Sequence, residues 1–219
     1  MNGAFSFIST TLPFLWQGLL TTLFVSLVVV VCSLLLGILV GVAFAYASWW
    51  LTLPLRAASD ILRGTPLLVV IFSIYYLLPF AGLNLQPLSA FLLALTLFKT
   101  AHVGEIARGA IQSIARGQTD AGKAIGLTFP QRLLYVIFPQ AIRRFLPPWI
   151  NSVTDAVKGS SLISLVGVVD LMLAAQQVIG RTYEPLPIYL LAASIYFGIN
   201  YCLSVLSRRL EARYAYIRD

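Results

Sequence analysis

Two small clusters of polar side chains stand inside long apolar stretches, and they are the groups with which this chain could do chemistry. Asp155 and Lys158 are three positions apart, and Ser160 and Ser161 follow them closely. Residues at this spacing share a helix face, so the carboxylate and the ammonium group can neutralise each other or bind a charged solute. The residues alone leave both roles open. With no nucleophile–base pair or metal-ligand group nearby, the chemistry indicated is binding.

Lys99 and His102 form the second cluster, within the apolar run 88–107. Charges at membrane depth are expensive and usually face a bundle interior or a water-filled cavity. Lys99 lies about 8 residues, or roughly 12 Å, from the end of its run, so structural pairing and a substrate or gating role both stay open. His102 shares its helix face, and a lone histidine is more often a bonded structural residue. Thr65 is a further candidate for a solute pathway.

The composition places the chain in the membrane class. It has 219 residues, of which 59% are hydrophobic and 11% charged, and its mean hydropathy is +0.87. The net charge of +7 could suggest nucleic acid. The basic residues instead sit beside apolar runs, as they do in cytoplasmic loops of membrane proteins. No phosphate-binding loop occurs in the sequence, so we expect no ATP site in this chain.

The apolar runs predict an all-α membrane protein whose single transmembrane domain covers residues 1–219. We expect five spans, with the N-terminus outside and the C-terminus, which carries Arg218, in the cytoplasm. A half-inserted helix should precede the last span. Arg56 and Arg63 should flank a short cytoplasmic turn, with Pro66 in the first turn of the following helix. The predicted spans are about 19–47, 59–80, 88–107, 136–158 and 188–206.

Small residues recur at every fourth position of the first span. Ser33, Gly37, Gly41 and Ala45 would lie on one helix face and let another helix approach closely. Packing within the same chain is the expected use of this stripe, ahead of a seam between two copies.

The polar middle of the chain, 104–139, should lie in the cytoplasm. Thr119 or Asp120 can cap a short helix, and Gly126 can end it in a left-handed conformation. Thr128 and Gln131 have the spacing of a capping box for the next helix. Near the start of this segment, we expect Glu105 to pair with Arg63 or Arg108.

Three local patterns resemble the membrane subunits of bacterial ABC importers. Asp120-Ala121-Gly122, followed by Gly126 and by Val-Ile-Phe-Pro at 136–139, resembles their EAA loop, with Asp in place of Glu and Gly122 in place of Ala. The runs RGTPLL (63–68) and KGSSL (158–162) are similar to the polar amino-acid branch of that family. Lys99 departs from the neutral or aromatic residue expected there. The resemblance covers roughly residue 19 to the C-terminus.

This resemblance implies a type I importer fold whose loop 108–135 carries a coupling helix for a separate ATPase subunit. The coupling residues implied are Arg116, Asp120, Ala121, Gly122, Lys123 and Gly126. ATP and Mg²⁺ would be bound by that partner, and this chain would hold no cofactor and no metal.

The implied function is import of a polar amino acid, or a derivative of one, across the bacterial inner membrane. The implied partners are an ATPase dimer, a second permease copy that is identical or related, an extracytoplasmic solute-binding protein and membrane lipid. The alternatives are a passive channel, a non-transporting membrane anchor for a cytosolic ATPase, and a permease for metal or sulfur compounds. A pathway rich in Met or His would favour the last of these, and the chain has only 2 Met and 1 His.

Overall fold

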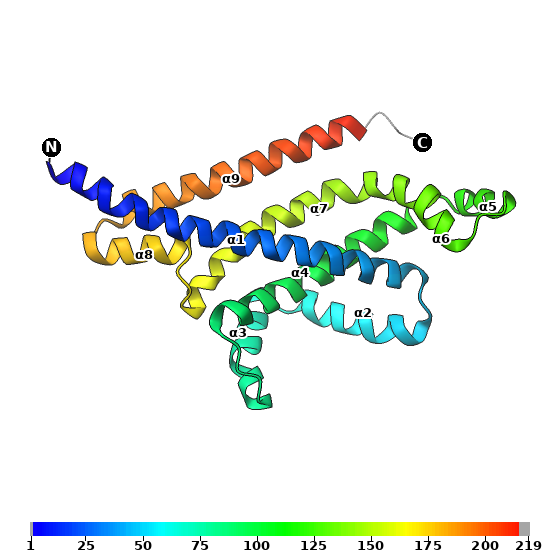
Figure 1. The fold of residues 1–219 in the computed structure, drawn as a ribbon, viewed down its shortest axis with the longest axis horizontal. Helices are drawn as coiled ribbons and strands as arrows, with labels where there is room; N and C mark the ends of the chain where they lie inside the picture. The colour runs from blue at the N-terminus through cyan, green and yellow to red at the C-terminus, as the bar shows by residue number, and fades with distance from the viewer. Residues whose placement is uncertain (1, 215–219) are drawn as a thin grey trace. The chain divides into compact units, whose positions relative to one another are not determined.

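The computed structural model describes the backbone of residues 2–214 and the side chains of residues 11–210 and Ala212. Every regular element in this range is helical, as predicted, and Figure 1 labels the α-helices in chain order. The predicted cytoplasmic position of Arg218 lies outside the described residues. The elements are α1 (Asn2–Tyr46), α2 (Trp49–Gly64), α3 (Leu67–Leu77), η1 (Leu78–Ala81), α4 (Pro87–Gln112), α5 (Arg116–Ala124), α6 (Phe129–Arg132), η2 (Leu133–Ile137), α7 (Phe138–Ser160), η3 (Ser161–Val166), α8 (Leu171–Thr182) and α9 (Pro185–Tyr214).

Three helical stretches among the described residues are long and apolar enough to cross a membrane. They are Thr11–Tyr46, Pro87–Gln112 and Pro185–Leu210. Two further stretches pass the same criterion only as bent pairs of helices. One pair is α2 with α3 and η1, bent by 110°, and the other is Phe129–Val166 with α8, bent by 52°.

The first bend corrects one prediction. Arg56 and Arg63 lie inside α2 and do not flank a turn. Their segment lacks a strong breaker until Gly64, after which Thr65 adopts an extended backbone with φ −95° and ψ 136°. A residue before proline is pushed out of the helical region, so Pro66 sets the break. Pro66 itself is the residue that precedes α3, one position earlier than predicted.

The second bend lies between α7 and α8. Helix α7 continues through Pro147 and Pro148 as far as Ser160. A tighter 3₁₀ segment, η3, then leads to Gly167, whose φ of +83° is one that glycine adopts readily. Helix α8 has 12 residues, about 18 Å of helix, which is too short to span a bilayer by itself, and its half-insertion stays a prediction.

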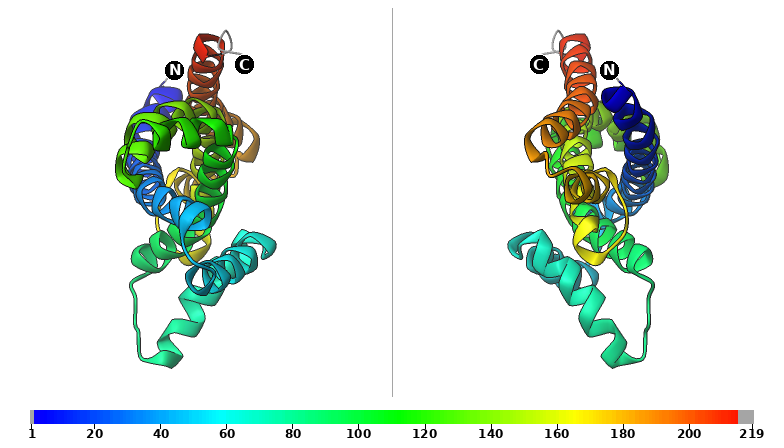
Figure 2. Two further views of the ribbon diagram at one scale, coloured as in Figure 1. Left: turned by 90° about the vertical axis from the view of Figure 1, so that its right-hand side faces the viewer. Right: turned by 90° about the vertical axis from the view of Figure 1, so that its left-hand side faces the viewer.

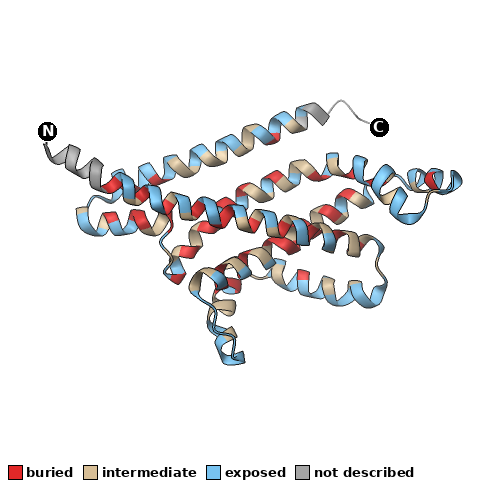
Figure 3. Ribbon diagram, in the orientation of Figure 1, coloured by how far each residue is buried: buried red, intermediate tan, exposed pale blue. Residues whose placement is uncertain are grey.

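The chain divides into two compact units, each built from several stretches of sequence. Unit 1 consists of residues 1–31, 66–96 and 154–202. Unit 2 consists of residues 32–65, 97–153 and 203–219. Figure 2 gives two further views of the helices, and Figure 3 colours the described residues by burial.

The core of unit 1 forms where α8 packs between the N-terminal part of α1 and the start of α9. Leu171 and Ala174 of α8 are completely buried there, together with Leu15 and Ile188. Gly18 of α1 permits the contact, because a Cβ at this position would lie 2.6 Å from the backbone oxygen of Asp170.

The core of unit 2 brings α4 against the C-terminal part of α1 and against α7. Val103 and Ala107 of α4 are buried in it. The predicted stripe of small residues makes this contact, since a Cβ on Gly37 would lie 2.5 Å from Val103 Cγ1 and one on Gly41 would lie 2.5 Å from Ala107 Cβ. Packing within the chain, as predicted, is therefore confirmed for these two glycines.

Candidate functional site

Helix α5 and the turn after it form a small, defined projection within unit 2. The turn satisfies the last carbonyls of the helix, because Gly126 N–H donates to Lys123 O at 2.9 Å and Leu127 N–H donates to Gly122 O at 3.0 Å. Gly126 adopts φ +79°, so the predicted left-handed end is confirmed. The predicted caps are wrong: the helix begins at Arg116, and Thr119 and Asp120 lie inside it.

Side-chain contacts hold this projection against the next helix. Gly122 is buried, and a Cβ there would come within 3.0 Å of the Arg132 methylenes. Arg132 Nη1 donates to Leu127 O at 2.7 Å. Thr128 N–H donates to Gln131 Oε1 at 2.9 Å, which confirms the predicted reach of Gln131 back to the start of α6. These contacts define the path of residues 122–132.

The outward face of α5 is mostly polar, with one large apolar residue just after its end. Arg116, Ala121 and Lys123 are exposed. Lys123 Nζ lies 3.0 Å from Asp120 Oδ1, and both side chains are largely in solvent. Ile125, directly after the helix, is 76% exposed. We term residues 116–126 the α5 knob.

Glu105 joins α2 to α4 inside unit 2. One of its oxygens accepts from Arg108 Nε at 3.0 Å, and the other lies 3.8 Å from Arg63 Nη1. Both predicted partners of Glu105 are thus confirmed. Asp60 lies 3.6 Å from the same Arg63 nitrogen, so two acids and two arginines form a connected set.

Three of the predicted pathway residues belong to unit 2. Lys99 is only 6% exposed and interacts with other groups of the chain. His102 is half-buried, its Nδ1 lies 2.9 Å from Phe98 O, and the two rings are 4.6 Å apart. Thr65 donates its hydroxyl to Ile61 O at 2.7 Å. His102 thus bonds within its own helix and Thr65 bonds to the last turn of α2, and contact of any of the three with a solute stays a prediction.

The other four predicted pathway residues belong to unit 1, at the end of α7. Lys158 Nζ lies 3.7 Å from Asp155 Oδ1, and the two side chains are 61% and 64% exposed. Ser161 is half-buried and donates to Lys158 O at 2.8 Å. Ser160 is completely buried, donates to Val157 O at 2.8 Å and accepts from Ser26 at 3.2 Å. Ser160 therefore holds α7 against α1 in this structure.

Sequence reasoning missed Asp170, which is completely buried in unit 1. Its Oδ1 accepts from Leu173 N–H at 2.9 Å, so it caps α8, and its Oδ2 lies 3.4 Å from the Tyr196 hydroxyl of α9. Thr22 of α1 accepts from Leu171 N–H at 3.1 Å. An acid directly before an apolar helical run is a start signal that could have revealed this cap.

Helix α1 therefore bonds to both sides of the break between α7 and α8. Ser26 meets Ser160 before the break, and Thr22 meets Leu171 after it. Thr22 and Ser26 are four residues apart and share one helix face. The segment that carries Lys158 and Ser161 is thus anchored at both ends. Within the described residues no group of three potential metal ligands occurs.

Comparison with solved structures identifies the fold. A crystal structure of an amino acid ABC transporter with histidines matches with a TM-score of 0.86 and 31% identity, covering 94% of this chain and 96% of that one. An inward-facing structure of the MetNI methionine ABC transporter matches with a TM-score of 0.72 at 20% identity, over 90% of this chain and 96% of that one. The fold is that of the membrane subunit of a type I ABC importer.

Sequence comparison then gives the family. A relative named as a probable glutamine ABC transporter permease, GlnP of Bacillus subtilis strain 168, is 36% identical over 92% of this chain and 94% of its own length. The glutamine transport system permease GlnP of Escherichia coli K12 is 34% identical, over 97% of this chain and 98% of its own length. Residues 33–216 match the model of one family, and the chain belongs to it: the binding-protein-dependent transport system inner membrane components.

The family settles several predictions made from sequence. The chain is a translocation subunit of an ATP-driven importer in the bacterial inner membrane, and ATP hydrolysis takes place in a separate subunit. The alternatives of a passive channel and of a non-transporting anchor are thereby set aside.

Proposed function

We propose that this subunit moves a polar amino acid into the cytoplasm, and that the α5 knob receives the work of the ATPase. The relatives at 36% and 34% identity carry names of glutamine permeases, which supports a substrate with an α-carboxylate and an α-ammonium group. Counting each bent helix pair as one crossing gives five spans, with the N-terminus outside and the C-terminus inside. Two permease copies, two ATPase subunits and a solute-binding protein complete the proposed assembly.

The observation that supports the coupling role is the combination of a fixed backbone and an exposed apolar side chain in the α5 knob. Its end is fixed by the two backbone bonds around Gly126, while Ile125 stays 76% exposed at its tip. A large apolar side chain on a rigid, exposed turn is suited to fill a pocket of a partner protein. Asp120 and Lys123 would lie at the rim of that contact, where exposed charges add little affinity but favour a particular partner.

The Asp155–Lys158 pair is the proposed contact for the substrate. At 3.7 Å its two atoms are farther apart than in a normal hydrogen bond, and both side chains are exposed, so opening the pair costs little. An amino acid could then place its carboxylate on Lys158 and its ammonium group on Asp155. The half-buried Ser161 hydroxyl is close in sequence and could add a polar contact. Lys99, His102 and Thr65 remain further candidates for the pathway.

The test is reconstitution of the whole transporter in liposomes with its binding protein. ATPase activity and uptake are measured against a panel of amino acids, which identifies the substrate. Lys158→Ala should lower uptake at least several-fold while the ATPase subunits still co-purify with the variant. Arg143→Ala, at an exposed cation of the same helix that belongs to neither the pair nor the α5 knob, is the control and should leave uptake unchanged. Normal uptake by Lys158→Ala would remove this pair from the pathway.

A further inference from the structure

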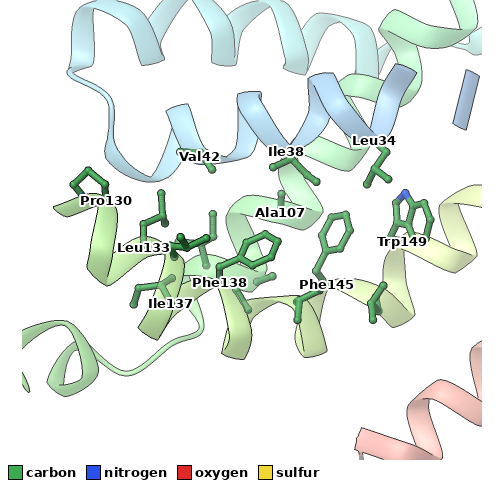
Figure 4. Close-up of a pocket in the computed structure, with 16 residues that line it drawn as sticks. Leu34, Ile38, Val42, Ala107, Pro130, Leu133, Ile137, Phe138, Phe145 and Trp149 are labelled. Carbon is green, nitrogen blue, oxygen red and sulfur yellow. The ribbon is translucent and has the colours of Figure 1, made fainter. Parts of the chain in front are cut away.

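Two adjoining recesses in unit 2 differ in one respect, since only the smaller is lined by a charged side chain, that of Arg132. The larger is an apolar groove of about 520 Å³ between the C-terminal part of α1, α4 and the start of α7 (Figure 4). The smaller has a volume of about 190 Å³ and is lined by Tyr46, Thr119, Phe129 and Arg132. Leu133 and Ile137 line both recesses, so the two lie next to each other.

The groove is lined almost entirely by apolar side-chain atoms. Phe138, Phe145 and Trp149 project into it from α7, opposite Ile38 and Leu34 of α1, as Figure 4 shows. Successive groove-lining residues from Phe138 to Trp149 extend roughly 16 Å along the helix at 1.5 Å per residue. A long apolar groove suits a hydrocarbon chain, and the Trp149 indole N–H is the one side-chain donor among its lining residues.

The smaller recess supplies a positive charge at one end of this groove. Arg132 donates one bond to Leu127 O and has no carboxylate within ion-pair distance among the described residues. The Tyr46 ring packs edge-on against Phe129 at 5.1 Å, which places a phenol and a guanidinium around one small space. A phosphate group is the complementary partner for this pair of donors.

The surrounding residues have the character of a membrane–water interface. Tyr46 is the last residue of α1, and Trp49 and Trp50 follow it, stacked on each other at 4.2 Å and more than 60% exposed. Exposed aromatic residues at a helix end are typical of headgroup depth. A ligand with its phosphate at this level and its hydrocarbon chain in the groove would therefore lie as a phospholipid does, with the phosphate at headgroup depth and the chain in the apolar region.

We propose that unit 2 binds one anionic phospholipid, with its phosphate at Arg132 and an acyl chain in the groove lined by Phe145 and Trp149. The site extends beyond the proposed transport function and does not depend on which solute is carried. The lipid would contact α6 and η2, the elements that follow the α5 knob directly in sequence. Anionic lipid thus becomes a structural ligand of the segment that we propose to meet the ATPase.

Trp149 provides a direct probe, because bromine atoms on an acyl chain quench tryptophan fluorescence on contact. The exposed Trp16, Trp49 and Trp50 are replaced by Phe, which leaves Trp149 as the reporter in the full chain. The protein is placed in bilayers that contain a small share of brominated phosphatidylglycerol, or of brominated phosphatidylcholine with the same chains. Quenching by phosphatidylglycerol should require about fivefold less lipid, the factor expected for one Arg–anionic-lipid interaction.

Two variants separate the headgroup contact from the groove. Arg132→Gln should abolish the preference for phosphatidylglycerol, whereas Arg143→Gln, an exposed Arg of α7 that lines neither recess, should retain it. Ala141→Phe should fill the groove and reduce quenching by both lipids. Equal quenching by both lipids in the parent protein, or an unchanged preference in Arg132→Gln, would overturn the proposal.

Two further outcomes would assign the recesses to another occupant. If inorganic phosphate removes the preference for phosphatidylglycerol at constant ionic strength, the basic recess binds a free anion and the lipid proposal is wrong. The groove could instead be covered by a second copy of the chain. A disulfide-linked dimer formed in membranes by Ile142→Cys, with Cys32 and Cys202 replaced by Ser, would show this and would equally refute a lipid site.

Discussion

Thr22→Val changes a single buried group and tests whether α1 holds the start of α8. The Thr22 hydroxyl accepts from Leu171 N–H at 3.1 Å and donates to Gly18 O at 3.1 Å, and the residue is 0% exposed. Valine has nearly the same shape but no oxygen. The variant therefore keeps the packing of α1, leaves the Leu171 N–H without its partner and also removes the hydrogen bond between Thr22 and Tyr196.

The size of the effect follows from this orphaned donor. Leaving a buried donor without a partner typically lowers the free energy of unfolding by about 1–3 kcal/mol. Polar contacts between helices in membranes average about 0.6 kcal/mol and reach about 1.7 kcal/mol. We expect a loss of about 1–2 kcal/mol, because a backbone donor at a packed helix start has few alternatives. At about 2–4 °C per kcal/mol for a chain of this length, Tm should fall by about 2–8 °C.

The measurement is the fraction of monodisperse protein that survives heating, followed by size-exclusion chromatography. Thr21→Val is the matched control, because the Thr21 hydroxyl bonds only to Gln17 O of its own helix, at 3.2 Å. Thr22→Ser should recover most of the loss, since it restores the hydroxyl. If Thr22→Val and Thr21→Val melt at the same temperature, the reasoning that α1 anchors α8 through this bond is refuted.

Two glycine substitutions give further predictions. Gly41→Ala should destabilise the chain by about 1–3 kcal/mol in the same heating assay, because its Cβ would lie 2.5 Å from Ala107 Cβ and 2.7 Å from Gly104 O. Gly109→Ala, with open space around it in α4, should instead be neutral or stabilising, and a loss as large as that of Gly41→Ala would contradict the packing argument. Gly126→Ala should speed amide hydrogen exchange at Leu127 about fivefold, since φ +79° disfavours a side chain by about 1 kcal/mol. Gly117→Ala, elsewhere in α5, is the control for this measurement and should not speed that exchange.

Local patterns allowed the best predictions from sequence. Gly126 ends α5 and Gln131 reaches back to Thr128, because both features depend on residues within a few positions. The caps assigned to Thr119 and Asp120 were wrong, since the helix begins three to four residues earlier without a side-chain cap. A capping residue marks a possible start, but a neighbouring helical turn can extend past it.

Contacts between residues that are far apart in the sequence could not be predicted from local patterns. Thr22 and Leu171 are 149 positions apart, and Ser26 and Ser160 are 134 apart, so no local spacing points to either pair. The sequence drew attention to Ser160 as a polar group at membrane depth, but its partner decides its role. Lys158 and Asp155 show a different case, because their spacing of three residues allowed a pair, now seen at 3.7 Å, but left solute binding equally open.

The π-helical turn η2 helps to set the orientation of the α5 knob relative to α7. Phe138 N–H bonds to Leu133 O, five residues back, so this turn holds one residue more than an α-helical turn would. Losing a single residue between 133 and 137 would convert it to ordinary α-helix and rotate the adjoining α6 by about 100° relative to α7. An insertion or deletion of one amino acid here could thus redirect the knob without altering its own sequence.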